Sequence, residues 1–400
     1  YCSAPGWHNP SAPTLSDLPM TCFAGVASVI DLSQSATTGI ILPGDFTSAI
    51  IGDLRPLAII YTGHSNSVPL RRREYWSSAP LLSPAIADML AERGVQHVCL
   101  DLSCDSISSK RSDGTGGIIN PNEAFRARAH SLGLVITENI KCSNPLQSEV
   151  FLFALPLSGH GMTTSPSRPV ALNTWPSDTP VICDVSTPYV NHWRWRLEMW
   201  RKITESPYDD RTEFLQMGHG YTHCDAPRHM KINGPTMQDL PGMGLDLFLG
   251  PAWIIDLSDI SLPSPITLEL LMSRAGKPPP GRRLILRTDL TNRLGYNSTR
   301  WHTDAPNLEV PAADWLVAQD PSAICIDFPQ DFIAREMPGR HVYNHEFVTH
   351  HAIFGAGVPF IEDLRDLGEI NCREPYLAAI PLKMTCIDGA PMRAVTLEWT

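Results

Sequence analysis

The chain has 400 residues, of which 43% are hydrophobic and 18% are charged, as is typical of a globular protein with a sizeable core. Its 31 basic and 42 acidic side chains give a formal charge of −11. This balance argues against a general nucleic-acid binder, and the short basic run Arg71–Arg73 fits a solvated loop. No apolar run reaches the ~18 residues that a membrane-spanning helix needs.

The ten cysteines are scattered and form no C-x-x-C pair, so we expect buried thiols rather than a disulfide framework. This predicts a reducing intracellular compartment: the cytoplasm, or an organelle such as the mitochondrion if a targeting peptide has been removed. The first residues, YCSAPGW, contain neither Met nor a signal-like segment, which indicates a processed chain or a fragment.

The sequence repeats itself. Tyr1–Pro19 (YCSAPGWHNPSAPTLSDLP) matches His223–Pro241 (HCDAPRHMKINGPTMQDLP), an offset of 223 − 1 = 222. Later matches follow in the same order with offsets of 224 to 226, and the last pairs ALPL at Leu157 with AIPL at Leu382. Drift of this size is what insertions in surface loops produce. We therefore predict two tandem domains, of which the first lacks its N-terminal part.

The first domain is predicted to cover residues 1–157 and the second to cover residues 180–400. The segment between them, 158–179, is rich in Ser, Thr and Pro and is the predicted linker.

Strand-like and helix-like segments alternate within the second copy. AWIIDLS (252–258) and RRLILRT (282–288) are short apolar runs with β-branched residues, as in buried strands. PAADWLVAQ (311–319) has helical spacing and a Pro at a first helical position. SAICIDF (322–328) and VPFIEDL (358–364) are again predicted strands. Such alternation predicts a layered α/β domain.

One short segment, MGHGYTHCDAPRHM, holds His219, His223, Asp225 and His229. Imidazole and carboxylate are ordinary ligands of Zn, Mn and Fe, so the cluster favours a metal site over a packed histidine group. Its glycines and Pro227 disfavour a helix. On an extended chain, the period of two places His219, His223 and Asp225 on one face. His229 follows the proline, where we expect the chain to have turned.

Three protein ligands leave coordination positions for water, and a bound metal lowers the pKa of that water until hydroxide forms near neutral pH. A separate histidine close by can shuttle the proton to a leaving amine. The segment therefore favours a metal-dependent hydrolase of an amide, imide or lactam.

The segment resembles the H-x-G-T-H-x-D-x-P-x-H signature of the cyclase family of metal-dependent hydrolases, which includes bacterial-type kynurenine formamidase (arylformamidase) and isatin hydrolase. Further stretches resemble later blocks of that family, in family order: ILRTDLTN, IDFPQD and HHAIFGAGVPFIEDL. The resemblance runs from about Val181 to Thr400. It implies two tandem cyclase-like α/β domains of the swivelling β/β/α type.

The same resemblance implies a centre of one or two Zn or Mn ions in the second copy. The implied ligands are His219, His223, Asp225, His350 and Glu362. Asp225 would bridge two metals, and His350 and Glu362 have the twelve-residue spacing of the family's remaining pair (362 − 350 = 12). His351 is the adjacent alternative to His350.

His229 matches the family's proton donor and acceptor and is the implied catalytic residue. Tyr221 stands where the signature has Gly, and we expect it to alter the pocket wall beside the metal. Trp193, in HWRWRLEMW, either forms part of an aromatic lid over the substrate or packs internally. Tyr221 and Trp193 are therefore predicted to contact the substrate.

The first copy lacks most of this set. Tyr1, Ser3 and Trp7 stand where the second copy has signature residues, and Arg126 stands where it has His350. Glu138 alone is retained, so we predict no metal in the first copy. Because family members assemble as dimers or larger, the resemblance implies that the two copies pair within the chain as a pseudo-dimer, which further copies or a larger complex can extend.

Two functions stay open at this point. The first is a metal-dependent amidohydrolase of a small molecule: an amide, an N-formyl arylamine, a cyclic imide or a lactam, with metal-bound hydroxide as nucleophile and His229 as proton shuttle. The second is a catalytically inactive, enzyme-derived structural subunit of a larger assembly, since the first copy shows that the chain tolerates loss of the site.

Overall fold

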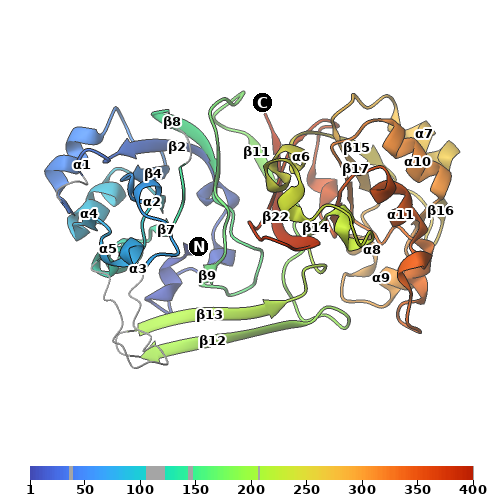
Figure 1. Ribbon diagram of the computed structural model, residues 1–400, viewed down its shortest axis with the longest axis horizontal. Helices are drawn as coiled ribbons and strands as arrows, with labels where there is room; N and C mark the ends of the chain where they lie inside the picture. Colours follow the sequence, from blue (N-terminus) through green and yellow to red (C-terminus); the bar gives the residue numbers. More distant parts are fainter. Residues whose placement is uncertain (36–38, 105–121, 143–146, 206–207, 400) are drawn as a thin grey trace. The chain divides into compact units, whose positions relative to one another are not determined.

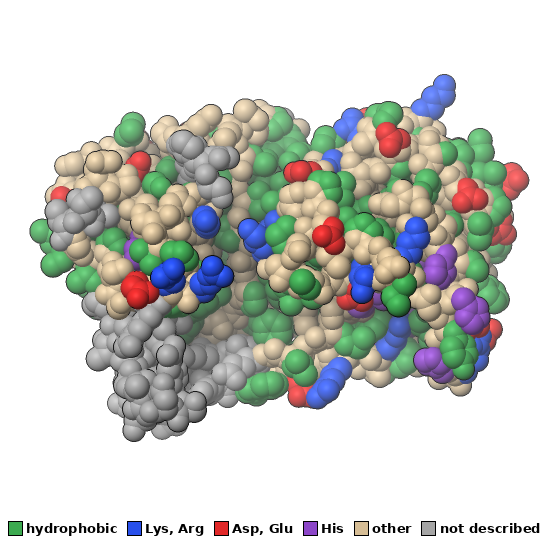
Figure 2. All heavy atoms as spheres, viewed as in Figure 1, with side chains coloured by type: hydrophobic (Ala, Val, Ile, Leu, Met, Phe, Trp, Pro, Cys, Tyr) green, Lys and Arg blue, Asp and Glu red, His purple; other side chains and the backbone are tan. Residues whose placement is uncertain are grey.

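The computed structural model shows a chain that divides into two compact units, each of mixed α/β structure (Figure 1). The described residues are 1–35, 39–104, 122–142, 147–205 and 208–399. The first unit is Tyr1–Asp178 with Met199–Glu213, and the second is Thr179–Glu198 with Phe214–Thr400. In the view of Figure 2, acidic and basic side chains are interspersed over the described surface.

The first unit is built on one eight-stranded sheet. Its strands, in spatial order, are β10 (Val170–Leu172), β8 (Glu149–Phe153), β2 (Ala24–Asp31), β4 (Leu57–Tyr61), β6 (His97–Leu100), β7 (Val135–Thr137), β1 (Cys2–Ser3) and β9 (Thr164–Ser165). The strands β2, β4, β6 and β7 run parallel, and the outer strands pair with them antiparallel. Parallel strands need covered faces, which explains their apolar sequences such as LAIIY and HVCL.

Helices cover this sheet. They are α1 (Pro43–Ala49), α2 (His64–Ser67), α3 (Arg73–Ser77), α4 (Pro84–Glu92) and α5 (Glu123–Ser131), and a small strand pair joins β3 (Ile40–Ile41) to β5 (Leu81–Leu82). The apolar face of α4, with Ile86 and Leu90 fully buried, lies in one hydrophobic cluster with Ile60 and Val98 of the sheet. Amphipathic spacing on a short helix thus gives the unit its core.

The predicted linker 158–179 contains two of these strands. Both β9 and β10 lie at the ends of the first sheet, where β9 pairs with β1 and β10 pairs with β8. Its Pro and Ser content is compatible with this position because edge strands tolerate residues that cannot complete a hydrogen-bond ladder.

The second unit also has an eight-stranded sheet. Its order is β11 (Val181–Asp184), β22 (Gly389–Glu398), β14 (His223–Asp225), β20 (Phe360–Glu362), β19 (Ala323–Ile326), β17 (Arg283–Arg287), β15 (Leu249–Asp256) and β21 (Tyr376–Pro381). Because β21 also pairs with β22, the sheet closes on itself. Its interior is a hydrophobic cluster that includes Cys224, Ile285, Cys325 and Ile361.

The remaining elements surround this closed sheet. They are α6 (Leu245–Phe248), α7 (Leu268–Ala275), α8 (Leu290–Leu294), α9 (Arg300–Thr303), α10 (Val310–Ala318) and α11 (Val348–Gly355), with the small strand pair β16 (Pro265–Ile266) and β18 (Asn307–Leu308). The strands β12 (Leu197–Glu205) and β13 (Tyr208–Gln216) form a two-stranded ribbon, most of which (Met199–Glu213) belongs to the first unit. The five strands and helices predicted within 252–364 are all confirmed, including the helix with Pro311 in its first turn.

The two sheets share one topology. The run β2-β4-β6-β7-β1 of the first corresponds to β15-β17-β19-β20-β14 of the second, with the same parallel and antiparallel pairings. The register agrees too, since Cys2 faces Thr137 in one sheet and Cys224 faces Ile361 in the other. These strands are related by the same offsets that relate the sequence matches.

All ten cysteines lie in described segments; none of them forms a disulfide bond, and eight are buried, as expected of core thiols. Within the described part of the chain, no helix is both long and apolar enough to cross a membrane.

Candidate metal centre

The segment that carries His219, His223 and Asp225 is extended only from His223 to Asp225, where it forms β14. Before it the chain turns, and Tyr221 has a left-handed backbone conformation with φ of 60°. The prediction of one extended face from His219 to Asp225 is therefore wrong. The turn nevertheless brings His219 to Asp225, with 2.7 Å between Nδ1 and Oδ1.

Neighbouring strands bring the next ligand candidate to the same place. His223 on β14 faces Glu362 on β20, and 3.6 Å separates Nε2 of His223 from Oε2 of Glu362. His223 Nδ1 donates to the Tyr221 carbonyl at 2.7 Å, which leaves Nε2 directed at Asp225 Oδ1, 3.2 Å away. A backbone hydrogen bond of this kind fixes the ring orientation of a metal-binding histidine.

Helix α11 supplies His350 to the cluster. Its Nε2 lies 3.2 Å from Glu362 Oε1, and its Nδ1 lies 2.6 Å from Asp331 Oδ2. A carboxylate behind a histidine in this way sets its tautomer and its basicity toward a metal. The adjacent His351 points elsewhere, with Nε2 3.0 Å from the Asn344 carbonyl. Of the two candidates, the structure brings His350 into the cluster.

The possible metal-ligand atoms lie close together, and some of them have no hydrogen-bond partner. Two sets place their ligand atoms within 4.8 Å of one another: His219, His223 and Asp225, and Asp225, His350 and Glu362. Asp225 belongs to both sets, as a bridging carboxylate must. Buried atoms without a hydrogen-bond partner in the described structure include Nε2 of His223, Oδ2 of Asp225 and Oε1 of Glu362. Buried polar atoms are normally satisfied, so these residues fit a divalent cation.

The electrostatics favour positive charge at this point. Burial opposes protonation of His219, His223 and His350, yet the neighbouring carboxylates raise their pKa values to about 10, 9 and 10. Burial also opposes ionisation of Asp225, but the histidines hold its pKa well below the ordinary value. A site that attracts protons this strongly attracts a metal cation for the same reason.

His229 lies beside the cluster in the 3-10 turn Pro227–His229, past the proline as expected. Its ring stacks on His219 at a centroid distance of 3.8 Å, and its Nε2 is 3.8 Å from Asp225 Oδ2. The turn thus aims an imidazole at the convergence point of the ligands without burying it fully.

Sequence reasoning missed Asp388, which forms a third group with His219 and His229. Its Oδ2 lies 3.0 Å from His219 Nε2 and 3.5 Å from His229 Nδ1. The next residue, Gly389, is required by space: a Cβ there would lie 2.5 Å from a ring carbon of His219. The Asp-Gly pair at the start of β22 was the available signal, but no spacing rule connects it to the histidines.

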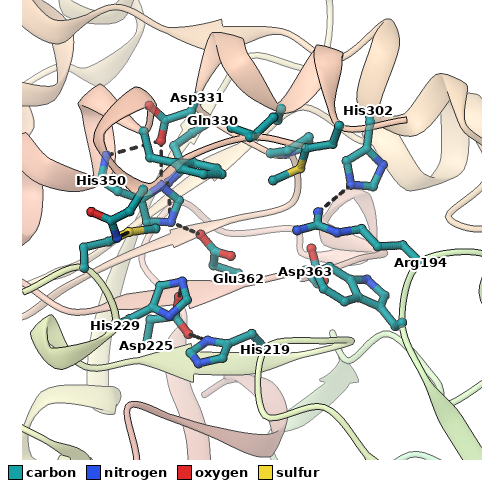
Figure 3. Close-up of a pocket in the computed structure, with 18 of the residues that line it drawn as sticks. Arg194, His219, Asp225, His229, His302, Gln330, Asp331, His350, Glu362 and Asp363 are labelled. Atoms are coloured by element: carbon teal, nitrogen blue, oxygen red, sulfur yellow. Dashed lines mark hydrogen bonds and ion pairs between the residues drawn. The ribbon is translucent and has the colours of Figure 1, made fainter. Parts of the chain in front are cut away.

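His229 and the five ligand candidates, His219, His223, Asp225, His350 and Glu362, line a cavity of about 490 Å³ within the second unit (Figure 3). Arg194, Trp195, Trp301 and Phe347 are among its other lining residues. A pocket with apolar aromatic walls and a few convergent polar groups is typical of a small-molecule site.

Neither residue predicted to contact the substrate is part of the cavity lining. Tyr221 is fully buried, and its hydroxyl donates to the Val190 carbonyl at 2.5 Å. Trp193 is 41% exposed and packs edge-on against His302. The left-handed turn at Tyr221 directs its side chain away from the ligands, while Trp195, two residues after Trp193, reaches the cavity.

Comparison with known proteins identifies the family. The Cyclase family model, described as "Putative cyclase", matches residues 1–105 and 155–330, which is more than half of the chain. The chain belongs to the cyclase family. The matched residues include segments of both units and the whole of the histidine-rich segment.

Curated relatives are similar over about half of the chain. The kynurenine formamidase of Bacillus cereus is 28% identical over 231 residues, which cover 57% of this chain and 94% of the relative. That of Bordetella petrii is 27% identical over 213 residues, covering 53% and 89%. Among solved structures, isatin hydrolase A from Labrenzia aggregata bound to benzyl benzoate is 20% identical, covers 55% of this chain and 94% of its own, and has a TM-score of 0.46.

Proposed function

We propose that this member of the cyclase family is a metal-dependent hydrolase that cleaves a C–N bond in a small aryl amide, with N-formyl arylamines as the favoured class and cyclic imides or lactams as related substrates. The observation that carries the proposal is the convergence of two histidines, a His–Glu pair and an aspartate shared by both ligand sets, on one aromatic cavity. Similarity to kynurenine formamidases supports the same class of substrate.

The ligands proposed for one or two Zn²⁺ or Mn²⁺ ions are His219, His223, Asp225, His350 and Glu362. A bound ion of this kind polarises a carbonyl oxygen and lowers the pKa of water. Neighbouring groups of the chain orient the proposed ligands. Asp331 holds His350 in the tautomer that presents Nε2, and the Tyr221 carbonyl does the same for His223.

We assign the proton transfer to His229. Its ring is partly exposed to the cavity, and it adjoins Asp225 without a buried hydrogen bond of its own to that carboxylate. From this position it can take a proton from water and deliver it to the leaving amine, a step that a positioned side chain typically accelerates by about 10²–10⁴-fold. The aromatic cavity walls exclude water from the aryl group.

The first unit is proposed to be non-catalytic. Arg126 and Glu138, which correspond to His350 and Glu362, form a buried ion pair with 3.1 Å between Nη1 and Oε1. The Arg126 guanidinium therefore balances the charge of Glu138, the one carboxylate of the ligand set that the first unit retains. We propose that the two units arose by duplication and that the first serves the second as an internal partner, in the manner of a pseudo-dimer.

The test is metal content and hydrolysis measured on the same purified chain. We expect one or two equivalents of Zn or Mn and turnover of N-formylkynurenine or isatin. His229→Gln should keep the metal but lose about 10²–10⁴-fold in kcat, whereas Asp225→Ala should lose both. Retention of metal by Asp225→Ala would contradict the bridging role.

The alternative is an inactive structural subunit. A chain that neither contains metal nor takes it up, and that hydrolyses neither substrate, would favour this alternative over the hydrolase.

A further inference from the structure

Two arginines line the cavity, and they differ in how their charge is used. Arg340 forms ion pairs with Glu336 and Glu346, at 2.5 and 2.6 Å. Arg194 forms no ion pair with any carboxylate of the described residues; its hydrogen bond within the cavity is from Nη1 to His302 Nε2 at 3.0 Å. The positive charge of Arg194 is therefore available to the contents of the cavity.

The structure holds this guanidinium in place. Its central carbon lies 4.0 Å above the ring of Trp195, a cation–π arrangement. Since Nη1 must donate, His302 accepts as a neutral imidazole. Burial, together with the charge of Arg194, lowers the pKa of His302 to about 3. A neutral acceptor fixes the orientation of Arg194 without neutralising it, and this leaves its other N–H groups free to bind a ligand.

A guanidinium in such a setting is costly unless an anion compensates it. Burial lowers the pKa of Arg194, although Asp363 and Glu362 act against this from a distance. In the view of Figure 3, Arg194 and His302 lie apart from His229 and His350, with Glu362 and Asp363 between them. The cavity thus has a metal-binding end and a cationic end, connected by aromatic walls.

We propose that Arg194 is a specificity-determining residue that binds a carboxylate of the substrate, so that the substrates are aryl amides carrying a carboxylate remote from the scissile C–N bond. The planar fork of a guanidinium matches a carboxylate with two parallel hydrogen bonds, and His302 and Trp195 orient that fork. This inference rests on the proposed hydrolase function and narrows its substrate class.

The competing explanation is that Arg194 only balances the charge of Asp363. That carboxylate already accepts a hydrogen bond from the Tyr296 hydroxyl at 2.7 Å, and it lies beyond ion-pair distance of Arg194. A purely balancing charge would affect acidic and neutral ligands alike, and this difference can be measured.

The experiment compares ligand pairs that differ in one charge. Binding of L-kynurenine and of its carboxamide to the metal-loaded full chain is measured by calorimetry, and kcat/KM is measured for the N-formyl derivative of each. The variant is Arg194→Gln. The control is Arg196→Gln, which removes a positive charge two residues further along the chain. The Arg196 side chain is 67% exposed and forms an ion pair with Glu198.

We expect the unmodified chain and Arg196→Gln to prefer the carboxylate ligand by about 10- to 100-fold, as a charge-assisted pair provides. Arg194→Gln should lose this preference through weaker binding of the acid alone, with KM raised and kcat little changed. Arg194→Lys, which keeps the charge but not the fork, should fall between them.

Equal affinity for both ligands, or no binding of either, would overturn the proposal. So would an equal loss for acid and amide in Arg194→Gln, since that pattern indicates a structural role. If neither formyl compound is hydrolysed but the carboxylate preference persists and depends on Arg194, the proposed reaction fails and the carboxylate subsite stands. If both are hydrolysed with equal kcat/KM, the reaction stands and the subsite fails.

Discussion

His350 and His351 are adjacent on α11 but have different surroundings. His350 is buried between Asp331 and Glu362, whereas His351 bonds the carbonyl of Asn344 near the surface. Helical geometry turns consecutive side chains by about 100°, so only one of two neighbours can face a given site. Sequence spacing alone left both open, and burial distinguishes them.

This difference gives a matched pair of variants. We expect His350→Gln to lower metal affinity by at least about tenfold, because a proposed ligand and its Asp331 support are lost together. His351→Gln, on the same helix, should bind metal as the unmodified chain does. Chelator competition with Zn²⁺ measures both, and equal affinities in the two variants would remove His350 from the ligand set.

At the residue scale, the sequence was most informative where ligands lie close together in the chain. His219, His223, Asp225 and His229 could be singled out because a short segment has few ways to keep them apart. Asp331, Asp388 and Arg194 could not, since each enters the site from a remote loop and no spacing relates it to the histidines. The turn at Tyr221 was also missed, because a left-handed conformation is rare for a residue other than Gly.

At the scale of elements, α5 and β7 of the first unit correspond to α11 and β20 of the second. Arg126 on α5 forms an ion pair with Glu138, which lies just after β7. The side-chain exposure is 1% for Arg126 and 0% for Glu138. The guanidinium of Arg126 also lies 4.3 Å above the ring of Trp7. A pair of this kind is costly to break from one side, because the remaining charge is left in the core.

We therefore expect Arg126→Met to destabilise the chain by about 3–5 kcal/mol. The double variant Arg126→Met with Glu138→Gln should recover much of that loss. In the unmodified chain the Cys104 N–H donates a hydrogen bond to Glu138 Oε2 at 2.8 Å, and the glutamine amide oxygen can still accept it. Arg128→Met is the control on the same helix: its pair with Asp88 is exposed, so its loss should have little effect on stability. Urea unfolding measures all three, and equal losses for Arg126 and Arg128 would contradict a buried ion pair of this importance.

Strand β6 carries a buried histidine that makes stability depend on pH. His97 Nδ1 donates to the Cys22 carbonyl at 2.7 Å, and its Nε2 accepts from Thr137 Oγ1 at 2.8 Å. Burial lowers its pKa from 6.5 to about 4. As the pH falls below 6.5, the unfolded chain binds a proton before the folded chain does, so stability decreases down to a pH of about 4.

His97→Gln should remove this dependence, because an amide can replace both hydrogen bonds and does not titrate. Between pH 6.5 and 4, the unmodified chain should lose on the order of 3 kcal/mol more than the variant does. The exposed His160, changed to Gln, provides the control. Unfolding free energies at several pH values measure the difference, and parallel pH profiles for His97→Gln and the unmodified chain would contradict the assignment.

At the scale of the whole molecule, apolar runs and their alternation were enough to predict an α/β fold, since buried parallel strands leave a strong sequence signal. The closure of the second sheet through β21 and β22 was not predictable, because it depends on pairing between strands that local patterns do not relate. Because the two sheets share a strand order, the same fold presents different side chains at equivalent positions in the two units. Ser3 on β1 stands where β14 has Asp225, and Ser3 Oγ lies 3.2 Å from His130 Nε2.

Metal binding should therefore stabilise one unit locally. At a Zn²⁺ concentration of 100 times Kd, we expect amide exchange that requires opening of the site to slow by about 100-fold in β14, β20 and the first turn of α11. The equivalent elements β1, β7 and α5 should exchange at unchanged rates, because Arg126 already compensates Glu138 there. Hydrogen exchange read by mass spectrometry resolves these segments, with Asp225→Ala as the variant that should show no slowing anywhere. Slower exchange in β1 and β7 of the unmodified chain would indicate a metal in the first unit and contradict the prediction that this unit binds none.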